Sequence, residues 1–176
     1  GFDNGTGYGR INARRALDMT PPPVAGLRDF ALADLPVKGT VSGTFANTAA
    51  SDNSYESVTE INEPSTGSPK KRRSLLEHTW RFSVTGGSQV FFRVETFHSS
   101  NTESDDFTFA WSTDNVSFTD MLTVTKTSDD NQTQAFLMPP ATAGTIYVRV
   151  VDTDRTLGRS SKDKVSVDQM FFESLP

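Results

Sequence analysis

Large apolar residues alternate with polar ones along much of the chain after residue 76. Two neighbouring stretches, HTWRFSV and QVFFRVETF, carry such residues at every second position: Trp80, Phe82, Val84, Val90, Phe92 and Val94. Alternate side chains of a β-strand point to the same face, so this spacing predicts two strands that each bury one face. Gly86 and Gly87 separate the two stretches and predict that they form a β-hairpin.

Two further stretches repeat the pattern. Their apolar positions are Phe107, Phe109, Trp111, Ile146, Val148 and Val150. From residue 37 onward, short runs rich in Val, Thr, Phe and Tyr are separated by clusters of Gly, Asn, Asp, Ser and Pro, which is typical of antiparallel sandwiches. The predicted fold class is all-β: a two-layer antiparallel β-sandwich, jelly-roll-like, of about eight or nine strands. The phenylalanines could also serve as exposed platforms for sugars, but their alternating positions favour a packed core.

The last predicted strand, KVSVDQMFF, changes phase in its middle. Val165 and Val167 occupy one phase, whereas Met170 and Phe172 occupy the other. One extra residue in a strand shifts the alternation by one position, and this is what a β-bulge does. The sequence therefore predicts a bulge near Asp168.

The N-terminal part of the chain has a different character. Residues 1–19 are rich in glycine and then in good helix formers, with Asn12 placed to cap a short helix. Pro21, Pro22 and Pro23 follow and favour an extended connection. We expect a closing helical segment at 1–19, a proline-rich linker at 20–35 and the sandwich domain at 36–176.

Composition narrows the functional classes. The 176 residues carry a formal net charge of −5, which argues against a nucleic-acid partner. The chain has no cysteine, so disulfides, thiolate metal sites and cysteine nucleophiles are excluded. No apolar run approaches the roughly 18 residues of a membrane helix, so we expect no membrane span.

The chain has two histidines, His78 and His98, around which a catalytic arrangement could form. His78 begins one predicted strand and His98 ends another, so both are expected as rim or cross-strand residues of the sandwich. The chain has neither the spacing of a serine nucleophile elbow nor that of a phosphate loop. We therefore expect no catalytic residues, with a hydrolase using two loop carboxylates as an open alternative.

Carboxylates are frequent in the predicted loops, and calcium binds six to eight oxygen ligands of this kind. Three groups are candidates: Asp52 with Asn53, the segment 103–106, and a final set of Asp152, Asp154, Asp163 and Asp168. The alternative is that these residues are solvated turn formers, because Asp and Asn bond their own backbone in turns.

The tail GTGYGRINARRAL resembles the end of a subtilisin-like serine protease catalytic domain. The matching positions of that short motif are Gly7, Gly9, Ile11, Asn12, Ala13 and Ala16. The resemblance implies that such a catalytic domain precedes this segment. The family's catalytic Asp, His and Ser motifs have no counterpart in residues 1–176, so activity is not implied for this chain.

The remainder resembles the calcium-stabilised jelly-roll modules, including carbohydrate-binding ones, that follow catalytic domains in secreted bacterial hydrolases. The matching segments are ASDNSYE, GTIYVRVVDTDRT and VSVDQMFF. In similar modules, acidic residues near the first and last strands hold a structural calcium, which implies Asp52, Glu56 and Asp168 as ligands here. The P-domain of proprotein convertases, also a jelly roll behind a subtilisin fold, is a related possibility.

The expected function is that of a non-catalytic accessory domain of a secreted subtilisin-like serine protease. It would stabilise the enzyme or tether it to a polysaccharide or cell-surface polymer. The alternatives are a self-contained carbohydrate-binding module and a P-domain-like folding partner of the protease. Each of these expectations places the chain outside the cell.

Overall fold

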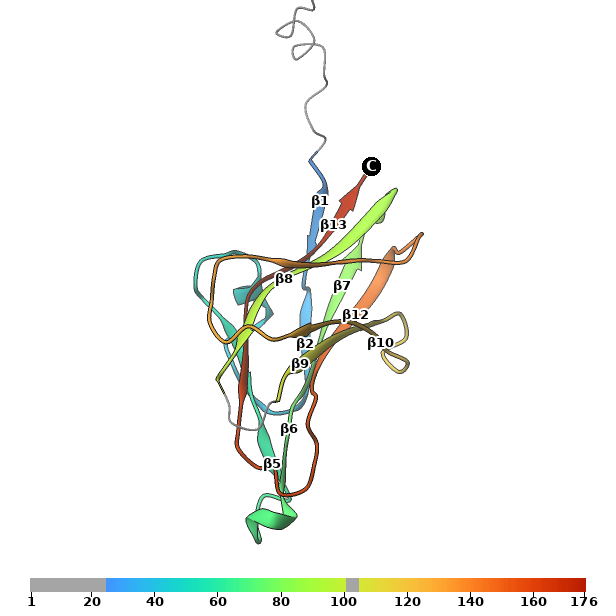
Figure 1. The fold of residues 1–176 in the computed structure, drawn as a ribbon. Coiled ribbons are helices and arrows are strands. Elements are labelled where there is room, and N and C mark those ends of the chain that lie inside the picture. The colour runs from blue at the N-terminus through green and yellow to red at the C-terminus, as the bar shows by residue number, and fades with distance from the viewer. Residues whose placement is uncertain (1–24, 101–104) are drawn as a thin grey trace, which may run out of the picture.

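Two antiparallel sheets packed face to face form a β-sandwich in the computed structural model, which describes residues 25–100 and 105–176 (Figure 1). The six-stranded sheet has the order β11 (Gln134–Leu137), β8 (Gln89–His98), β13 (Lys164–Leu175), β4 (Glu56–Thr59) and β3 (Thr40–Ser42), and β1 (Leu27–Phe30) also pairs with β13. The five-stranded sheet has the order β10 (Thr119–Val124), β9 (Phe107–Ser112), β12 (Gly144–Asp152), β7 (Glu77–Val84) and β2 (Ala33–Lys38). This architecture confirms the predicted all-β sandwich.

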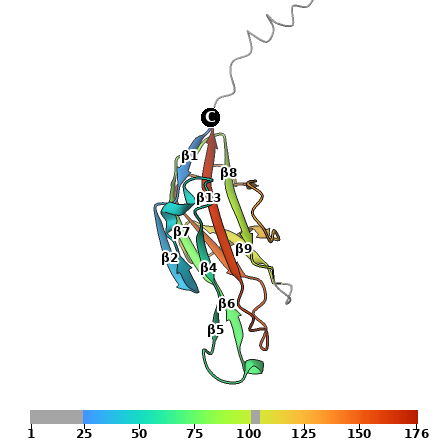
Figure 2. The same ribbon diagram turned by 90° about the vertical axis from the view of Figure 1, so that its left-hand side faces the viewer.

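Small elements complete the described part of the chain. Strands β5 (Ile61–Glu63) and β6 (Arg73–Leu75) form a separate ladder that projects from the end of the sandwich opposite the C-terminus (Figure 2). The helical elements of the described residues are two short 3-10 turns, η1 (Phe45–Thr48) and η2 (Pro69–Lys71). Among these residues, no helix is long and apolar enough to cross a membrane.

The predicted hairpin between β7 and β8 is wrong. Strand β7 pairs with β12 and β2, whereas β8 pairs with β13 and β11, so the two strands lie in different sheets. The connection between them turns a corner against the end of β13, where Ser88 N donates to the Leu175 carbonyl at 2.8 Å. A Cβ on Gly87 would lie 2.0 Å from the same carbonyl oxygen. Gly87 is thus needed for close backbone approach at a corner.

The alternating stripes meet in one core between the sheets. Phe109 of β9 lies 5.9 Å from Phe92 of β8 and 6.0 Å from Trp80 of β7, measured between ring centroids. Phe82 and Phe172 make an edge contact across the sheets at 5.0 Å. All five rings are at most 1% exposed. These aromatic residues therefore belong to the core, as their spacing predicts.

The sandwich begins earlier than the expected boundary at residue 36. Strand β1 and the first half of β2 fall within the expected linker at 20–35, and Leu27 pairs with Ser174 while Ala33 pairs with Arg81. Both strands are short and lie next to the proline run, so their alternation is weak in the sequence. The tail motif and the three prolines lie outside the described residues.

The predicted bulge in the last strand is confirmed. Val167 pairs with Thr96 of β8, but Gln169 pairs with the next residue, Glu95, so Asp168 is the extra residue. Val165, Val167, Met170 and Phe172 can thus all face the core despite the change of phase.

We predict that Phe109→Ala lowers the free energy of unfolding by about 3–5 kcal/mol, because it leaves a cavity between rings of both sheets. Chemical denaturation measures this loss. Val116→Ala is the control, because Val116 is 80% exposed and its truncation should change stability little. Equal losses in the two variants would contradict the described core.

Candidate functional site

The bulge in β13 brings Asp168 next to two other carboxylates. Glu95 comes from β8, and Asp129 comes from the loop between β10 and β11. Carboxylate oxygens of the three residues lie within 4.8 Å of one another. Asp168 and Glu95 are almost fully buried, so their charges are largely withdrawn from water. We call Glu95, Asp129 and Asp168 the bulge cluster.

The loop that precedes β4 closes over the bulge cluster. The backbone N–H of Asp52 donates to Asp168 Oδ1 at 3.4 Å. The Tyr55 hydroxyl lies 2.8 Å from Asp129 Oδ2 and 2.9 Å from the side-chain oxygen of Asn53. These contacts join a loop, a strand bulge and a second loop at one point of the six-stranded sheet.

The bulge cluster concentrates negative charge. The hydrogen bond with Asp129, assisted by burial and by the nearby carboxylates, raises the pKa of Tyr55 to about 12. Burial, and then the charges of Asp168 and Asp129, raise the pKa of Glu95. Glu95 Oε1 and Asp168 Oδ2 are buried without a hydrogen-bond partner among the described residues. Oxygen donors in this arrangement suit calcium, so the bulge cluster could bind that ion.

The expected ligand set of Asp52, Glu56 and Asp168 is divided in the structure. Asp52 lies beside Asp168 but offers it a backbone N–H, while its own carboxylate accepts from Ser54 N at 2.9 Å. Glu56 pairs with Val167 in the ladder and belongs to a different group, with Asp34 and His78 between the sheets. Its side chain therefore points into the sandwich, away from the loop that covers Asp168.

Sequence reasoning missed Glu95 and Asp129 as neighbours of Asp168. Glu95 stands in the outward phase of its strand, where an acidic residue is ordinary, and Asp129 lies in a polar loop. Their proximity depends on which strands pair and in which register, and the alternation of one sequence does not contain that information.

A third acidic group joins the loops at the end of the sandwich that carries β5 and β6. It consists of Glu60, Asp105 and Asp163, all of them buried. The N–H of Asp163 donates to Glu60 Oε2 at 2.8 Å, and the hydroxyl of Thr153 donates to Asp105 Oδ1 at 3.0 Å. We call these three carboxylates the loop cluster. It includes members of two candidate groups from the sequence, while Glu103 lies outside the described residues.

Burial is the main cause of the shifted pKa values of the acidic residues in and beside the loop cluster. It raises the pKa of Glu60 to about 8, and the charges of Asp105, Asp152 and Asp163 add to the shift. Burial also raises the pKa of Asp152 to about 6, although the N–H of Leu76 donates to this carboxylate at 2.8 Å. Both groups therefore hold protons more tightly in the folded chain than in the unfolded one.

Both histidines are buried cross-strand residues, because His78 pairs with Val150 and His98 pairs with Val165. His78 is fully buried between the sheets. His98, 4% exposed, has Nδ1 2.8 Å from the Ser99 carbonyl and Nε2 3.4 Å from Asp106 Oδ1. The sequence did carry a signal for His78, because it lies two residues before Trp80 and shares the inward phase of that strand.

The outer face of the five-stranded sheet carries a row of planar and charged side chains. Tyr147 of β12 pairs with Arg81 of β7 on one side and with Ser112 of β9 on the other. Two residues further along, the Arg149 guanidinium lies over the ring of Phe118 at 4.0 Å and contacts Glu77 Oε1 at 3.4 Å. We call Arg81, Tyr147 and Arg149, with Glu77 and Phe118, the sheet-face row.

We predict that calcium raises the melting temperature of the chain through the bulge cluster. A ligand bound only by the folded state stabilises it by RT ln(1 + [L]/Kd), about 2.7 kcal/mol at a hundredfold excess over Kd. Thermal melts with chelator and with millimolar calcium measure the difference. Asp168→Asn should abolish the calcium response, whereas the exposed Asp120→Asn should keep it. A response that is absent from the unaltered chain, or that survives in Asp168→Asn, would refute the site.

A second prediction concerns pH. Glu60 and Asp152 have folded-state pKa values of about 8 and about 6, above their ordinary values of 4.5 and 3.8. Their contribution to stability is full below the ordinary values and is lost as the pH rises through the folded ones. Chelator-treated protein should therefore lose melting temperature as the pH rises from about 4 to about 8, with Glu60 alone responsible for the part above pH 6. Glu60→Gln should flatten this slope, and an unchanged slope would show that Glu60 does not titrate there.

Comparisons with known proteins find likeness in shape but not in sequence. No family model and no curated protein sequence matches the chain. Among solved structures, a family GH115 4-O-methyl-α-glucuronidase with specificity for decorated arabinogalactans is similar at 12% identity and a TM-score of 0.41. The match covers 89% of this chain but 19% of the glucuronidase.

Two carbohydrate-binding modules are similar at comparable levels. A family 29 module, determined with cellulohexaose, has 8% identity and a TM-score of 0.38, and the match covers 86% of this chain and 93% of the module. The module TmCBM61, determined with β-1,4-galactotriose, has 13% identity and a TM-score of 0.33, covering 76% and 86%. None of these three structures is a protease, so the subtilisin-like neighbour stays a prediction from the tail sequence. At these identities and TM-scores, the likeness assigns no family and no ligand to this chain.

Proposed function

We propose that the chain is a non-catalytic binding module that holds a polysaccharide on the outer face of its five-stranded sheet. The sheet-face row is the observation that supports this role. Flat groups, such as the ring of Tyr147 and the guanidinium of Arg149, can stack on the apolar face of a sugar ring. The charged groups beside them can bond the sugar hydroxyls with charge-assisted hydrogen bonds.

The contacts within the row hold its polar groups in position. Arg149 lies between the ring of Phe118 and the carboxylate of Glu77. Because these contacts already restrict its side chain, Arg149 loses less conformational entropy when a ligand binds. Arg81 is exposed and pairs with Tyr147, so its guanidinium is available to a ligand that lies across β7 and β12. A partly ordered row of this kind favours weak but specific contacts with a repeating polymer.

The length of the row also suits a polymer. Its residues lie on β7, on β12 and just before β10, and with the flanking strands β2 and β9 this part of the sheet is four strands wide, about 14 Å at the usual strand spacing. Leu35 of β2 pairs with Thr79 and is exposed beside the row. Several sugar units could contact the sheet together, and each added contact would lower the dissociation rate.

The proposal includes a place in a larger protein. The tail motif supports a position behind the catalytic domain of a secreted subtilisin-like protease, joined through the Pro21–Pro23 run. A module tethered in this way raises the effective concentration of its enzyme near the polymer that it binds. In this arrangement the sandwich targets the enzyme and contributes no catalytic group.

We predict that the chain is retained by insoluble polysaccharides and that Tyr147→Ala and Arg149→Ala each weaken retention several-fold, because each removes a flat group from the row. Affinity electrophoresis in gels containing cellulose derivatives, galactans or arabinogalactans measures the effect. Arg93→Ala is the matched control, because Arg93 pairs with Glu173 on the other sheet. Failure of every polysaccharide to retard the unaltered chain, or equal retardation of all variants, would exclude the proposed face.

A further inference from the structure

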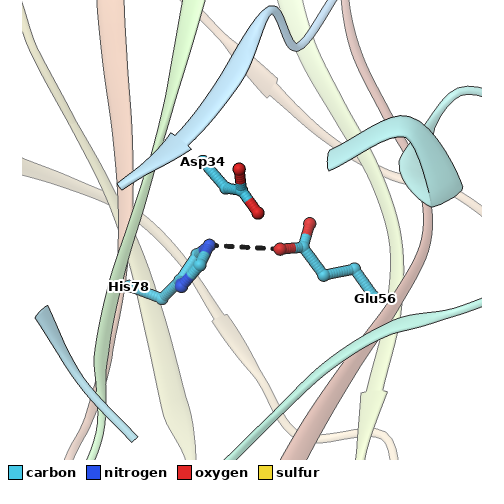
Figure 3. Close-up of side chains that lie close together, drawn as sticks. All are labelled: Asp34, Glu56 and His78. Carbon is cyan, nitrogen blue, oxygen red and sulfur yellow. Dashed lines mark ion pairs between the residues drawn. The ribbon is translucent and has the colours of Figure 1, made fainter. Parts of the chain in front are cut away.

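Three side chains of mixed chemistry converge between the two sheets, apart from the bulge cluster. Glu56 comes from β4 of the six-stranded sheet, and His78 and Asp34 come from β7 and β2 of the five-stranded sheet (Figure 3). One ligand atom from each residue lies within 4.8 Å of the others. We call Asp34, Glu56 and His78 the intersheet cluster.

The register of β2 and β7 explains why two of these polar residues point inward. Asp34 pairs with Trp80, and Pro36 pairs with His78. Directly paired residues of an antiparallel ladder share a face, and Trp80 is fully buried in the core. The alternation that builds the core thus also directs Asp34 and His78 into the space between the sheets.

The intersheet cluster contains buried polar atoms without hydrogen bonds. Glu56 and His78 are both 0% exposed. Among the described residues, Glu56 Oε1 and both ring nitrogens of His78 make no hydrogen bond, although Oε1 lies 3.2 Å from Nε2. A buried polar atom that lacks a partner costs free energy comparable to a lost hydrogen bond or more. A bound cation would accept lone pairs from both side chains and so supply the missing partner.

The carboxylate of Glu56 is held in one orientation. Trp80 Nε1 donates to Glu56 Oε2 at 2.6 Å, a short and buried contact. The His78 ring lies against the Trp80 ring, with 4.5 Å between their centroids. Trp80 therefore occupies one oxygen of the carboxylate and leaves the other directed at His78 Nε2. Hydrogen bonds that orient ligand side chains in this way are usual around metal ions in proteins.

The separation of the two atoms is close to that expected for a shared metal ion. Zinc binds His nitrogen and carboxylate oxygen at about 2.0–2.2 Å, and two such ligands at a tetrahedral angle lie about 3.3–3.6 Å apart. The observed separation of Nε2 and Oε1 is 3.2 Å. Asp34 supplies a third oxygen and is partly exposed, which gives an ion access from solvent.

We propose that Asp34, Glu56 and His78 bind a divalent transition metal of the zinc class, which links the two sheets. An imidazole nitrogen with two carboxylates suits such ions, whereas calcium prefers oxygen ligands alone. Three protein ligands leave one position of a tetrahedral ion for water. This inference is independent of the polysaccharide face and assigns Glu56 to a metal of a different class from the calcium expected at Asp168.

The alternative state of the cluster is a protonated His78 paired with Glu56 and no metal. The two states differ in their response to metal ions, so titration of the untagged, chelator-treated chain separates them. The proposal expects one equivalent of zinc to bind and the melting temperature to rise. It also expects one equivalent of cobalt(II) to give the visible absorption of a tetrahedral site. Absence of stoichiometric binding, with no shift in melting temperature, would overturn it.

Variants locate the site. Asp34→Ala should weaken zinc binding at least tenfold, and the exposed Asp120→Ala on the same sheet should not. His78→Gln should abolish the cobalt absorption. If that buried substitution prevents folding, the unaltered chain and Asp34→Ala still decide the question. Zinc binding at full strength in Asp34→Ala would overturn the proposal.

The bulge cluster supplies the last control. Asp168→Asn should remove the calcium response and leave zinc binding unchanged, because Asp168 lies in a different cluster from Glu56. If Asp168→Asn abolishes zinc binding and Asp34→Ala does not, the ion occupies the bulge cluster and the proposed intersheet site is wrong.

Discussion

The period-two alternation of β13, interrupted once, is the constraint on which the rest of the structure depends. This strand lies between β8 and β4 and also pairs with β1, so its register fixes the position of three other strands. A continuous alternation would direct either Val165 and Val167 or Met170 and Phe172 away from the core. The extra residue at Asp168 removes that conflict. The same residue then contributes a carboxylate beside Glu95, so the solution to a packing problem also creates a charged site.

Burial of acidic groups is the second common theme, and each cluster compensates for it differently. In the loop cluster, backbone N–H groups donate to the buried carboxylates, as Asp163 N–H does to Glu60. The bulge cluster uses a loop N–H and the Tyr55 hydroxyl. In the intersheet cluster the indole of Trp80 satisfies one oxygen of Glu56. These partners do not offset burial everywhere, because desolvation is still the main cause of the raised pKa values of Glu60 and Glu95.

The sequence predicted the features that depend on local alternation. The stripe through Trp80 and Phe82 and the phase change at Asp168 both follow from the order of residues along one strand, and both are confirmed. Features that depend on pairing between distant strands could not be predicted. The glycine pair at 86–87 predicts a hairpin, but the chain turns a corner into the other sheet there. Glu56 and Asp168 lie near each other along paired strands, but successive residues of a strand face opposite sides of a sheet, so the two belong to different clusters.

The pairing of β1 with the last part of β13 determines how the sandwich responds to mechanical load. Leu27 pairs with Ser174 and Phe30 with Phe171, so the two ends of the described sandwich enter and leave at the same pole. Tension between these ends pulls the two strands apart at the outermost pair, Leu27 and Ser174, and loads the remaining pairs one after another. Strands loaded from opposite ends would instead have to shear all their hydrogen bonds together. A load applied between these two ends therefore acts first on the Leu27–Ser174 pair.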